Sequence, residues 1–482
     1  MAIVRNEFVW RAFFRRFAIA LRFAPALFLL LPAWKVAAAQ VSNAASPTPA
    51  EMPGASITLG DAVVALNGPW KFHTGDDPRW AQPDFDDSSW ETVDLTPPPG
   101  AHDSDVGLTG YVPGWGARGH SGYFGYAWYR LRISASAPPG ETLALCGPFY
   151  VDYAYQVFVE GKLLGGVGDF SKRPPTAYNI HLPKIYPLSW TLDSASSGSE
   201  NSVVIAVRAW MGPWALGLPD AGGIHIAPAL GTTAGAESLY HIQWSEMIKG
   251  YVVDASEGVL FLLLAGMVCT LIPFDRSDPA YRWLAAALVL IALARANQAV
   301  FFWWQFESVQ GFELATIVLF VPLSLGAWTL AWCSWLRLRE YAWMPKVAGI
   351  ATVLYIAMES LRRSWFYGDF PHWVNAFTGL GITVIRLLFA LLTCWMIFRG
   401  LMQANREKWL TLASIVLISI GLFASELSML HIPGIWFPFG VGVSRTEYAY
   451  AGFDAVFFAL LLQRLFSFAR ERSTLTPAAS ER

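Results

Sequence analysis

The sequence has few charged residues and few cysteines. Asp, Glu, Lys and Arg make up only 15% of its 482 residues, whereas a soluble globular domain carries about 25%. This deficit excludes a single water-soluble enzyme as a description of the whole chain. Of the four cysteines, only Cys146 lies outside the apolar runs, and no pair has the spacing of metal ligands. Disulfide bonds and structural zinc are therefore excluded as organising elements, and we expect no cofactor and no metal.

The sequence also has no large excess of either charge, because 34 basic residues nearly balance 36 acidic ones and the net charge is −2. No overall field favours nucleic acid as a partner. Hydrophobic residues make up 54% of the chain, but they are unevenly distributed. Residues 40–245 hold most of the Asp, Pro and Gly-rich loops, whereas residues 250–470 hold apolar runs of about 20 residues, long enough to cross a bilayer. We expect a membrane protein with one sizeable soluble domain.

Residues 1–39 have the order of a secretory signal peptide. Several arginines precede a short apolar segment, Phe23–Trp34, and Ala37-Ala38-Ala39 follows as the expected cleavage site. Cleavage after Ala39 is the favoured interpretation, and an uncleaved anchor is the alternative; in both, the next domain is exported. Residues 40–56 are rich in Ser, Ala, Pro and Thr and predict a flexible linker.

Residues 57–245 contain short runs with the period of β-strands, at Trp128–Ile133, Tyr155–Glu160 and Ser202–Trp210. Gly- and Pro-rich turn signals flank these runs. Many short strands without a long helical stripe predict an all-β antiparallel sandwich. The length suits one such domain and leaves no room for a barrel of eight βα units.

Five motifs follow one another in this domain. They are Gly68-Pro69-Trp70-Lys71-Phe72, Phe85-Asp86-Asp87-Ser88-Ser89-Trp90, Gly125-Tyr126-Ala127-Trp128-Tyr129-Arg130, Val157-Phe158-Val159-Glu160-Gly161-Lys162 and Asn201-Ser202-Val203-Val204-Ile205-Ala206-Val207-Arg208. Their order resembles the sugar-binding, galactose-binding-like jelly roll at the N-terminus of family 2 glycoside hydrolases. The chain departs from that family at Glu160, where the family usually has Asn. In those enzymes the domain is an accessory without catalytic carboxylates, so the resemblance implies a jelly-roll fold and no catalytic residue.

Individual side chains in this domain have two interpretations each. Asp86 and Ser88 fit the cap of a turn, with Trp90 packed inward, although neighbouring carboxylates also permit a calcium site. The tryptophans within strands are expected in the core. Aromatic residues on Gly- and Pro-rich loops are better candidates for stacking on a sugar ring or an apolar ligand. These candidate ligand contacts are Trp115, Tyr123, Tyr178 and Trp214, and the alternative is packing against the sandwich or the membrane surface.

The second half of the chain predicts seven transmembrane helices. The apolar runs are Tyr251–Pro273, Arg282–Trp304, Phe312–Trp335, Trp343–Met358, Trp373–Phe398, Trp409–Leu430 and Tyr448–Phe468. Tryptophan or tyrosine lies at or near at least one end of every run, as interfacial aromatic belts require. With the N-terminal domain outside, basic residues are concentrated on the inner side, which predicts a cytoplasmic C-terminus. We expect a multi-pass protein of the bacterial inner membrane with a periplasmic domain at 57–245, a helical domain at 250–470 and a short tail at 471–482.

An exported jelly roll followed by seven spans resembles the bacterial seven-transmembrane receptors with diverse intracellular signalling modules. In that family a kinase, cyclase or phosphatase follows the last span. Residues 469–482 carry no signature of such a module. The resemblance therefore implies a ligand sensor whose output comes from a separate cytoplasmic signalling protein.

Ionisable residues within the spans are costly in hydrocarbon and are therefore informative. They are Asp254, Glu257, Arg295, Glu359, Arg386, Glu426 and Asp454. Arg295 and Arg386 are predicted to pair with carboxylates such as Glu426 and Asp454 in an outer polar pocket, where the docked jelly roll or a ligand biases two helix packings. A static set of ion pairs is the alternative. Asp254 and Glu257 are expected to lie merely at the membrane interface.

The sequence is compatible with three functions. The leading one is an envelope receptor, not an enzyme, that binds a carbohydrate or a small carboxylated compound. A membrane transporter, or a membrane-embedded enzyme of envelope glycan metabolism using the intramembrane carboxylates, is the second. Against it stand the absence of repeated spans, their odd number, and the lack of a nucleophile elbow or zinc motif. A passive glycan-binding surface protein is the third, and seven spans exceed what an anchor needs.

Overall fold

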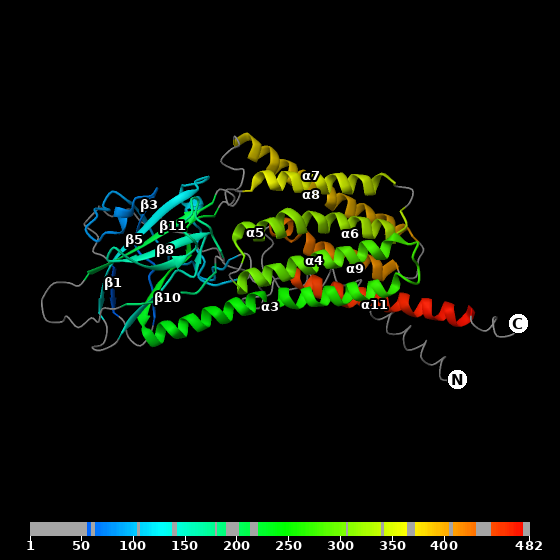
Figure 1. Cartoon of the computed structure of the whole chain (residues 1–482), viewed down its shortest axis with the longest axis horizontal. Helices are drawn as coiled ribbons and strands as arrows, with labels where there is room; N and C mark the ends of the chain where they lie inside the picture. The colour runs from blue at the N-terminus through cyan, green and yellow to red at the C-terminus, as the bar shows by residue number, and fades with distance from the viewer. Residues whose placement is uncertain are drawn as a thin grey trace. The chain divides into compact units, whose positions relative to one another are not determined.

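The strands of the N-terminal half form a β-sandwich, shown with the helices that follow it in a computed structural model (Figure 1). The structure describes residues 55–58, 63–103, 107–136, 142–178, 181–188, 202–212, 220–304, 307–338, 342–363, 372–403, 408–429 and 445–475. The predicted signal peptide and nearly all of the predicted linker lie outside these residues.

The sandwich contains one large and two small sheets. The larger sheet has the order β4 (Glu91–Val93), β3 (Trp70–Thr74), β5 (Gly125–Ser136), β11 (Ser202–Met211), β8 (Ala154–Val159) and β9 (Lys162–Val167), with β1 (Ala55–Thr58) parallel to β5. The second sheet has the order β10 (Ile185–Pro187), β6 (Leu143–Cys146), β13 (Ala229–Thr232) and β2 (Val64–Ala65). A separate pair joins β12 (Ile224–Ile226) to β7 (Tyr150–Val151). Apart from β1, the strand pairs are antiparallel, so the predicted antiparallel sandwich is confirmed.

Strand β5 shows how the sequence period builds the core. Tyr129, Leu131 and Ile133 alternate along the strand and enter the apolar core between the sheets. Trp128 lies on the opposite face, where the chain around η1 (Pro78–Ala81) and Trp90 covers it. Both faces of the strand are therefore buried. Trp70 of β3 and Trp210 of β11 are buried as well, so all three strand tryptophans lie inside, as predicted.

Two turns carry the motifs noted in the sequence. The amide of Ser88 donates to Asp86 Oδ1 at 3.0 Å and Trp90 is buried, which confirms the predicted capped turn. At the β8–β9 turn, Glu160 and Gly161 both have positive φ, +50° and +76°. Asn is favoured at such positions, but here the Glu160 carboxylate accepts from the Val204 amide at 2.5 Å and holds the turn to β11.

The helical half begins earlier than the hydropathy predicted. Helix α3 covers Thr233–Leu271, so it starts within the segment 57–245 that the sequence assigned to the β domain. Thr232, the last residue of β13, caps the helix, because its hydroxyl accepts from the Gly235 amide at 3.2 Å. The first turns of α3 contain polar residues and lie on the second sheet, where Ala144 and Cys146 contact Ala236. Hydropathy alone does not detect such a segment.

Nine further helical segments follow α3 among the residues that the structure describes. They are α4 (Pro279–Trp303), α5 (Val309–Glu313), the π-helical η4 (Leu314–Phe320), α6 (Val321–Trp335), α7 (Trp343–Arg362), α8 (His372–Met402), α9 (Lys408–Leu422) with α10 (Ala424–Met429), and α11 (Arg445–Leu475). Helix α11 thus continues into the predicted tail.

Among the described residues, six helices are long and apolar enough to cross a membrane. They correspond to six of the seven predicted runs. The other run is divided into α9 and α10 by a break at Phe423. The amide of Phe423 still donates to Ser419 O, and the amide of Leu427 to Phe423 O, so helical bonding continues across the break. The two segments together reach about 33 Å, the thickness of a bilayer core, and the count of seven spans stays a prediction.

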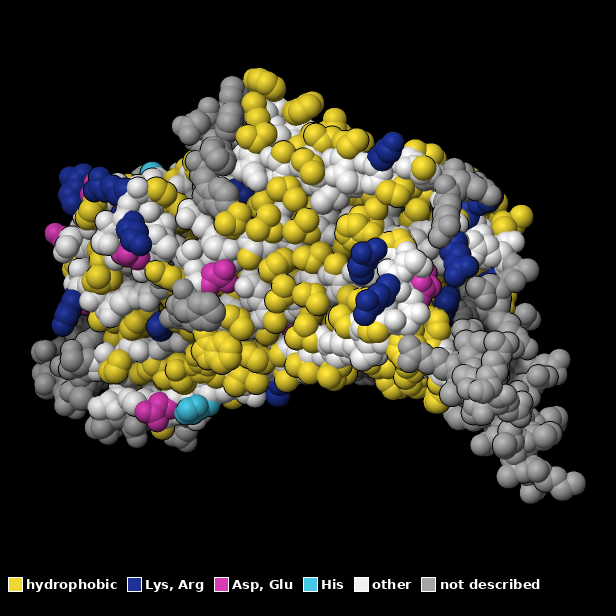
Figure 2. Space-filling view, turned by 45° about the vertical axis from the view of Figure 1, so that its right-hand side comes forward, with side chains coloured by type: hydrophobic (Ala, Val, Ile, Leu, Met, Phe, Trp, Pro, Cys, Tyr) yellow, Lys and Arg dark blue, Asp and Glu magenta, His cyan; other side chains and the backbone are white. Residues whose placement is uncertain are grey.

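Apolar side chains cover much of the visible surface of the helices (Figure 2). Large exposed examples are Leu263, Val353, Trp373 and Leu380, each more than 60% exposed. Contiguous exposed apolar surface of this kind is suited to lipid rather than water. The chain is therefore built as a multi-pass membrane protein, whereas its membrane and topology remain predictions.

Candidate functional site between the sandwich and the helices

The sandwich and the helices share one apolar core. Tyr251 of α3, Phe302 of α4 and Val309 of α5 belong to the same buried cluster as the strands. Phe302 stacks on Tyr251 with ring centroids 3.9 Å apart and on His181 of the sandwich at 5.2 Å. The Val309 amide also donates to Ala177 O at 3.0 Å. Side chains of the two parts are therefore packed directly against one another.

Tyr153 carries a polar contact across this junction. It follows β7 and has φ +69°, an uncommon conformation for a bulky residue. Its hydroxyl donates to Glu313 Oε1 at the end of α5 at 3.2 Å, and both side chains are buried. Burial and then the Glu313 carboxylate raise the pKa of Tyr153 well above its ordinary value, which keeps the hydroxyl a donor.

Glu313 continues this contact into α7. Its Oε2 lies 3.9 Å from an Arg363 guanidinium nitrogen, and Arg363 also binds Glu359 Oε2 at 2.7 Å. Glu359, Arg363 and Glu313 are all at least nine-tenths buried. We call Tyr153, Glu313, Glu359 and Arg363 the junction cluster. It connects the sandwich, α5 and α7 by hydrogen bonds and charge.

A second cluster, the Arg295 cluster, joins α3, α4 and α11. Arg295 lies 2.9 Å from Asp254, 2.7 Å from Glu257 and 3.4 Å from Glu447. Asp254 and Glu257 are 1% and 4% exposed and both pair with Arg295, so they belong to a buried ion-pair network. Their position at the membrane interface stays a prediction.

A third group surrounds Arg386 of α8. Its guanidinium pairs with Glu426 of α10, as predicted, and donates to the Tyr355 hydroxyl of α7 at 3.1 Å. It also donates to Leu422 O at 3.3 Å, at the break between α9 and α10. The Arg386 side chain therefore satisfies a carbonyl beside the break, as buried irregular backbone requires.

The predicted single pocket is divided among these groups. Arg295 and Arg386 have separate partners, and Glu359 belongs to the junction cluster. Asp454 of α11 is 8% exposed, and neither carboxylate oxygen has a hydrogen-bond partner among the described residues.

Sequence reasoning missed a buried pair beside the junction. His225 Nε2 lies 3.0 Å from Asp152 Oδ2, and His225 Nδ1 lies 2.8 Å from Val112 O. Burial opposes the charge on His225, but the attraction and hydrogen bonds of Asp152 raise its pKa overall. Burial likewise opposes charge on Asp152, yet His225 and the Gly222 amide lower its pKa. The pair is separated by 73 positions, and no local pattern could have indicated it.

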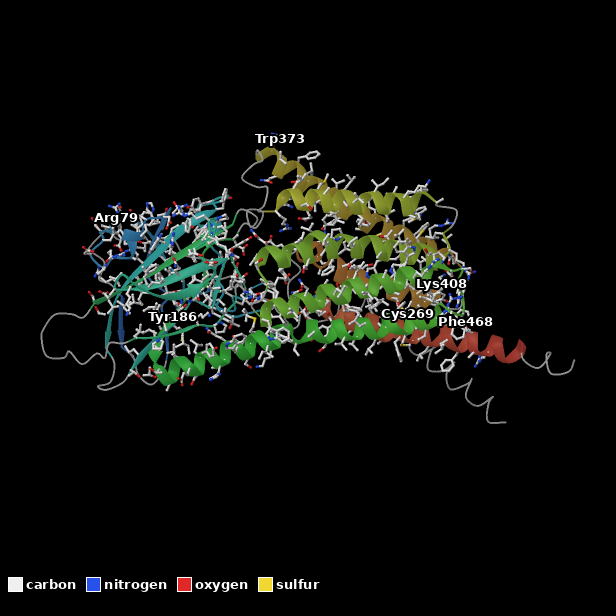
Figure 3. All side chains as sticks on the ribbon, in the orientation of Figure 1. Arg79, Tyr186, Cys269, Trp373, Lys408 and Phe468 are labelled. Atoms are coloured by element: carbon white, nitrogen blue, oxygen red, sulfur yellow. The ribbon has the colours of Figure 1, made fainter. Side chains whose placement is uncertain are left out.

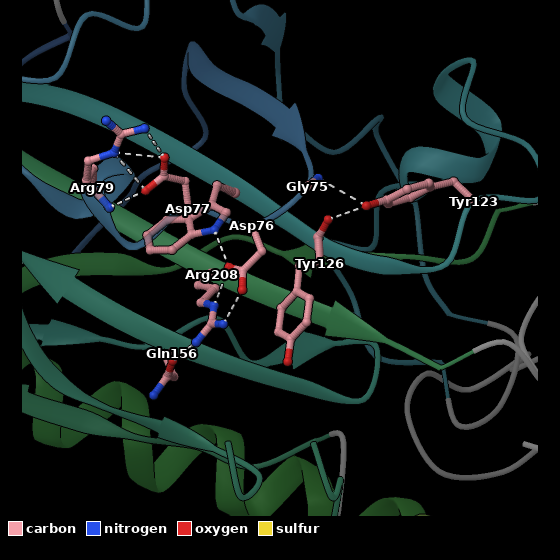
Figure 4. Close-up of polar contacts among 9 residues, drawn as sticks. Gly75, Asp76, Asp77, Arg79, Tyr123, Tyr126, Gln156 and Arg208 are labelled. Carbon is pink, nitrogen blue, oxygen red and sulfur yellow. Dashed lines mark hydrogen bonds and ion pairs between the residues drawn. The ribbon is translucent and has the colours of Figure 1, made fainter. Parts of the chain in front are cut away.

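The predicted ligand-contact aromatics lie in different surroundings. Trp115 is 1% exposed and packs on Phe72, an arrangement that matches the alternative of packing against the sandwich. Tyr123 is half-buried, and its hydroxyl bridges the Gly75 amide and Tyr126 O (Figure 4). Tyr178 is half-buried next to Ala177, at the junction with α5. Trp214 lies outside the described residues, so the ligand-contact role of all four stays a prediction.

Tyr126 also belongs to a polar surface on the larger sheet. Arg208 donates to both Asp76 oxygens at 2.7 and 2.5 Å and to Gln156 Oε1 at 2.9 Å (Figure 4). The guanidinium lies 4.5 Å from the Tyr126 ring centroid. No three His, Cys, Asp or Glu side chains are arranged to hold a metal ion in the part of the chain that the structure describes.

No family model and no curated protein matches the sequence. Among solved structures, a calcium-binding mutant of Bacteroides uniformis β-glucuronidase 2 is 18% identical with a TM-score of 0.23, and covers 35% of this chain and 17% of its own. A β-glycosidase from Bacteroides vulgatus is 20% identical with a TM-score of 0.22, and covers 35% and 20%. A β-glucuronidase from glycoside hydrolase family 2 is 19% identical, with a TM-score of 0.23 and coverage of 36% and 18%. The chain spans about a fifth of these structures, and their similarity to it is distant.

Proposed function

We propose that the protein is a bacterial envelope receptor. Its sandwich binds a carbohydrate or a small carboxylated compound, and its helices relay the change to a separate cytoplasmic signalling protein. The observation that carries this proposal is the junction cluster, because a buried hydrogen bond from a strained tyrosine to a membrane helix couples the two halves. A passive anchor requires no such contact.

Helix α3 supplies the second support. It begins directly at the cap residue Thr232 and continues for 39 residues, about 58 Å at 1.5 Å per residue. Strand β13 and this helix therefore have no flexible linker between them. A rearrangement of the second sheet would displace α3, whose opposite end carries Cys269 (Figure 3).

Transport is the alternative that one observation favours. The break at Phe423 lies beside Arg386, and discontinuous helices in transporters carry substrate sites. Accumulation of labelled uronic acids or carboxylates in vesicles containing the protein would support that function. Absence of accumulation together with ligand binding to the sandwich would support the receptor.

The receptor proposal is tested on the full chain in lipid nanodiscs. Galactose, glucuronate and succinate are screened by thermal unfolding, where a ligand at 100 times its dissociation constant adds about 2.7 kcal/mol. A spin label on Cys269 then reports the inner end of α3, with Cys394→Ser removing the other exposed cysteine and Cys146 and Cys333 buried. Ligand should change the spectrum of the label.

The matched variants are Tyr153→Phe and Tyr155→Phe. Both lose one buried hydroxyl, but only Tyr153 binds a helix residue. We expect Tyr153→Phe to bind ligand and lose the response at Cys269, and Tyr155→Phe to keep it. An equal response in both variants would contradict coupling through the junction cluster.

A further inference from the structure

Four carboxylates lie on α3 and α11 around Arg295 of α4. Asp254 and Glu257 belong to α3, and Glu447 and Asp454 to α11. Arg295 pairs with the first three of them. Helix α9, which also packs on α11, carries a basic residue only at its first position, Lys408. All four carboxylates lie in helices that are apolar enough to span the membrane. Full ionisation would leave excess negative charge in hydrocarbon, which is strongly unfavourable.

Among these four carboxylates, Asp454 has neither an ion pair nor a hydrogen bond within the described residues. Its two oxygens are inaccessible to solvent and have no hydrogen-bond partner among the described residues. Glu257 Oε1 is in the same condition, although Oε2 binds Arg295. Phe261, one turn after Glu257, and Phe453, next to Asp454, lie 6.1 Å apart at the α3–α11 contact. Two carboxyl groups with unsatisfied oxygens therefore lie near the same contact between the two helices.

Neutralisation requires a proton or a metal cation. The described residues contain no group of three suitable ligands for a metal, whereas one proton on a carboxyl group removes the excess charge and supplies a donor. We propose that Asp454 forms a proton-binding site within the membrane, at the α3–α11 contact that also carries Glu257. Its occupancy holds α3 against α11, and its loss places two like charges across the same contact. This inference does not rest on the proposed function, since the charge balance is independent of what the sandwich binds.

Infrared difference spectroscopy of the full chain in nanodiscs tests the proposal directly. At neutral pH the wild type should show the carbonyl band of a protonated carboxylic acid, shifted in heavy water and lost on titration to alkaline pH. Asp454→Asn should abolish this band, because Glu257 can then ionise against Arg295. Glu426→Gln is the control, and it should keep the band. Should Asp454→Asn not fold, Glu257→Gln must alter the band instead. A band unchanged in both variants, or absent from the wild type, would overturn the proposal.

Stability provides an independent readout. If a proton is bound only in the native state, the unfolding equilibrium constant rises roughly tenfold per pH unit between the pH at which the unfolded chain releases the proton and the higher pH at which the native protein releases it. The wild type should show this pH-dependent loss of stability, and Asp454→Asn should not. An identical pH dependence of stability in the wild type and the variant would contradict the proposed proton site. Thermal unfolding at constant pH, with sodium or potassium added, tests whether a metal ion rather than a proton occupies the site. Stabilisation by sodium in the wild type that Asp454→Asn loses would assign the site to a metal ion and overturn the proton.

Discussion

Arg130 in the sandwich is buried and Arg295 in the helices is largely buried, but the two side chains have different kinds of partner. Arg130 pairs with Asp87 at 2.7 Å and donates to the carbonyls of Trp80, Gln82 and Phe85. These acceptors come from one stretch of chain that covers the larger sheet. Arg295 instead binds carboxylates from two other helices. The first arrangement fastens a loop to its own domain, whereas the second joins elements that can move as separate bodies.

This difference indicates where conformational change can occur. Carbonyls along one loop move together, so the Arg130 contacts have one arrangement. Carboxylates on separate helices can exchange an arginine or a proton, which permits two arrangements of similar free energy. The variants below test whether the charges between helices differ in this way from those within the sandwich.

The largest effect is expected at Arg295. Arg295→Met removes the positive charge that pairs with Asp254, Glu257 and Glu447 and should lower the free energy of unfolding by about 4 kcal/mol. The loss should be smaller at low pH, because protonation of the carboxylates replaces the missing cation. Denaturation of the full chain in nanodiscs at several pH values measures it. Arg386→Met is the comparison and should cost less, since the Glu426 side chain is 40% exposed and can be hydrated. A larger loss at Arg386, or an unchanged fold and response in Arg295→Met, would remove the basis for a functional Arg295 cluster.

The second-largest loss of stability is expected at Arg130. Arg130→Met removes donors from several carbonyls and should cost about 3 kcal/mol. Unlike the loss at Arg295, it should not decrease at low pH, because most of the acceptors are carbonyls. The exposed Arg132 donates to Pro83 O alone and provides the control, with a loss of about 0.5 kcal/mol or less for Arg132→Met. A strong pH dependence in Arg130→Met would contradict the proposed difference between the two regions.

His225→Gln should lower the free energy of unfolding by about 2 kcal/mol at pH values at which His225 and Asp152 are both charged. The raised pKa of His225 makes its contribution complete below its ordinary value of 6.5 and lost as the pH rises through the folded value. The lowered pKa of Asp152 makes its contribution complete above 3.8 and lost as the pH falls through its folded value. The difference from wild type should therefore be largest between these values. Thermal unfolding against pH measures it, with the exposed His241→Gln as control; a pH-independent difference would be inconsistent with a charged pair.

The smallest effect on stability is expected for Tyr153→Phe, about 1 kcal/mol, because one hydrogen bond is lost while the ring remains. Hydrogen exchange should nevertheless increase at the start of α5, where the Val309 amide binds Ala177 O. Denaturation and exchange on the same sample separate the two quantities. An increase confined to the sandwich would show that Tyr153 does not hold the helices.

The strand period and turn signals were sufficient to predict the sandwich, since Tyr129, Leu131 and Ile133 alternate into the core as expected. They did not indicate that Trp115, on a Gly- and Pro-rich loop, is buried against Phe72. A loop follows no period, so its aromatic residues point where tertiary contacts place them. In the helices, length and apolarity predicted the spans but not the break at Phe423, although Gly421, a residue type that permits a kink, lies two positions before it.

The sequence alone determined the class of each half, because composition and period reflect the solvent that each segment meets. It also determined that several charges must be neutralised inside the helices. Only the tertiary structure decided which charges meet, since an apolar run does not specify how a helix is rotated about its axis. That rotation and the docking of the sandwich bring Asp254 and Glu257 to Arg295, and Tyr153 to Glu313.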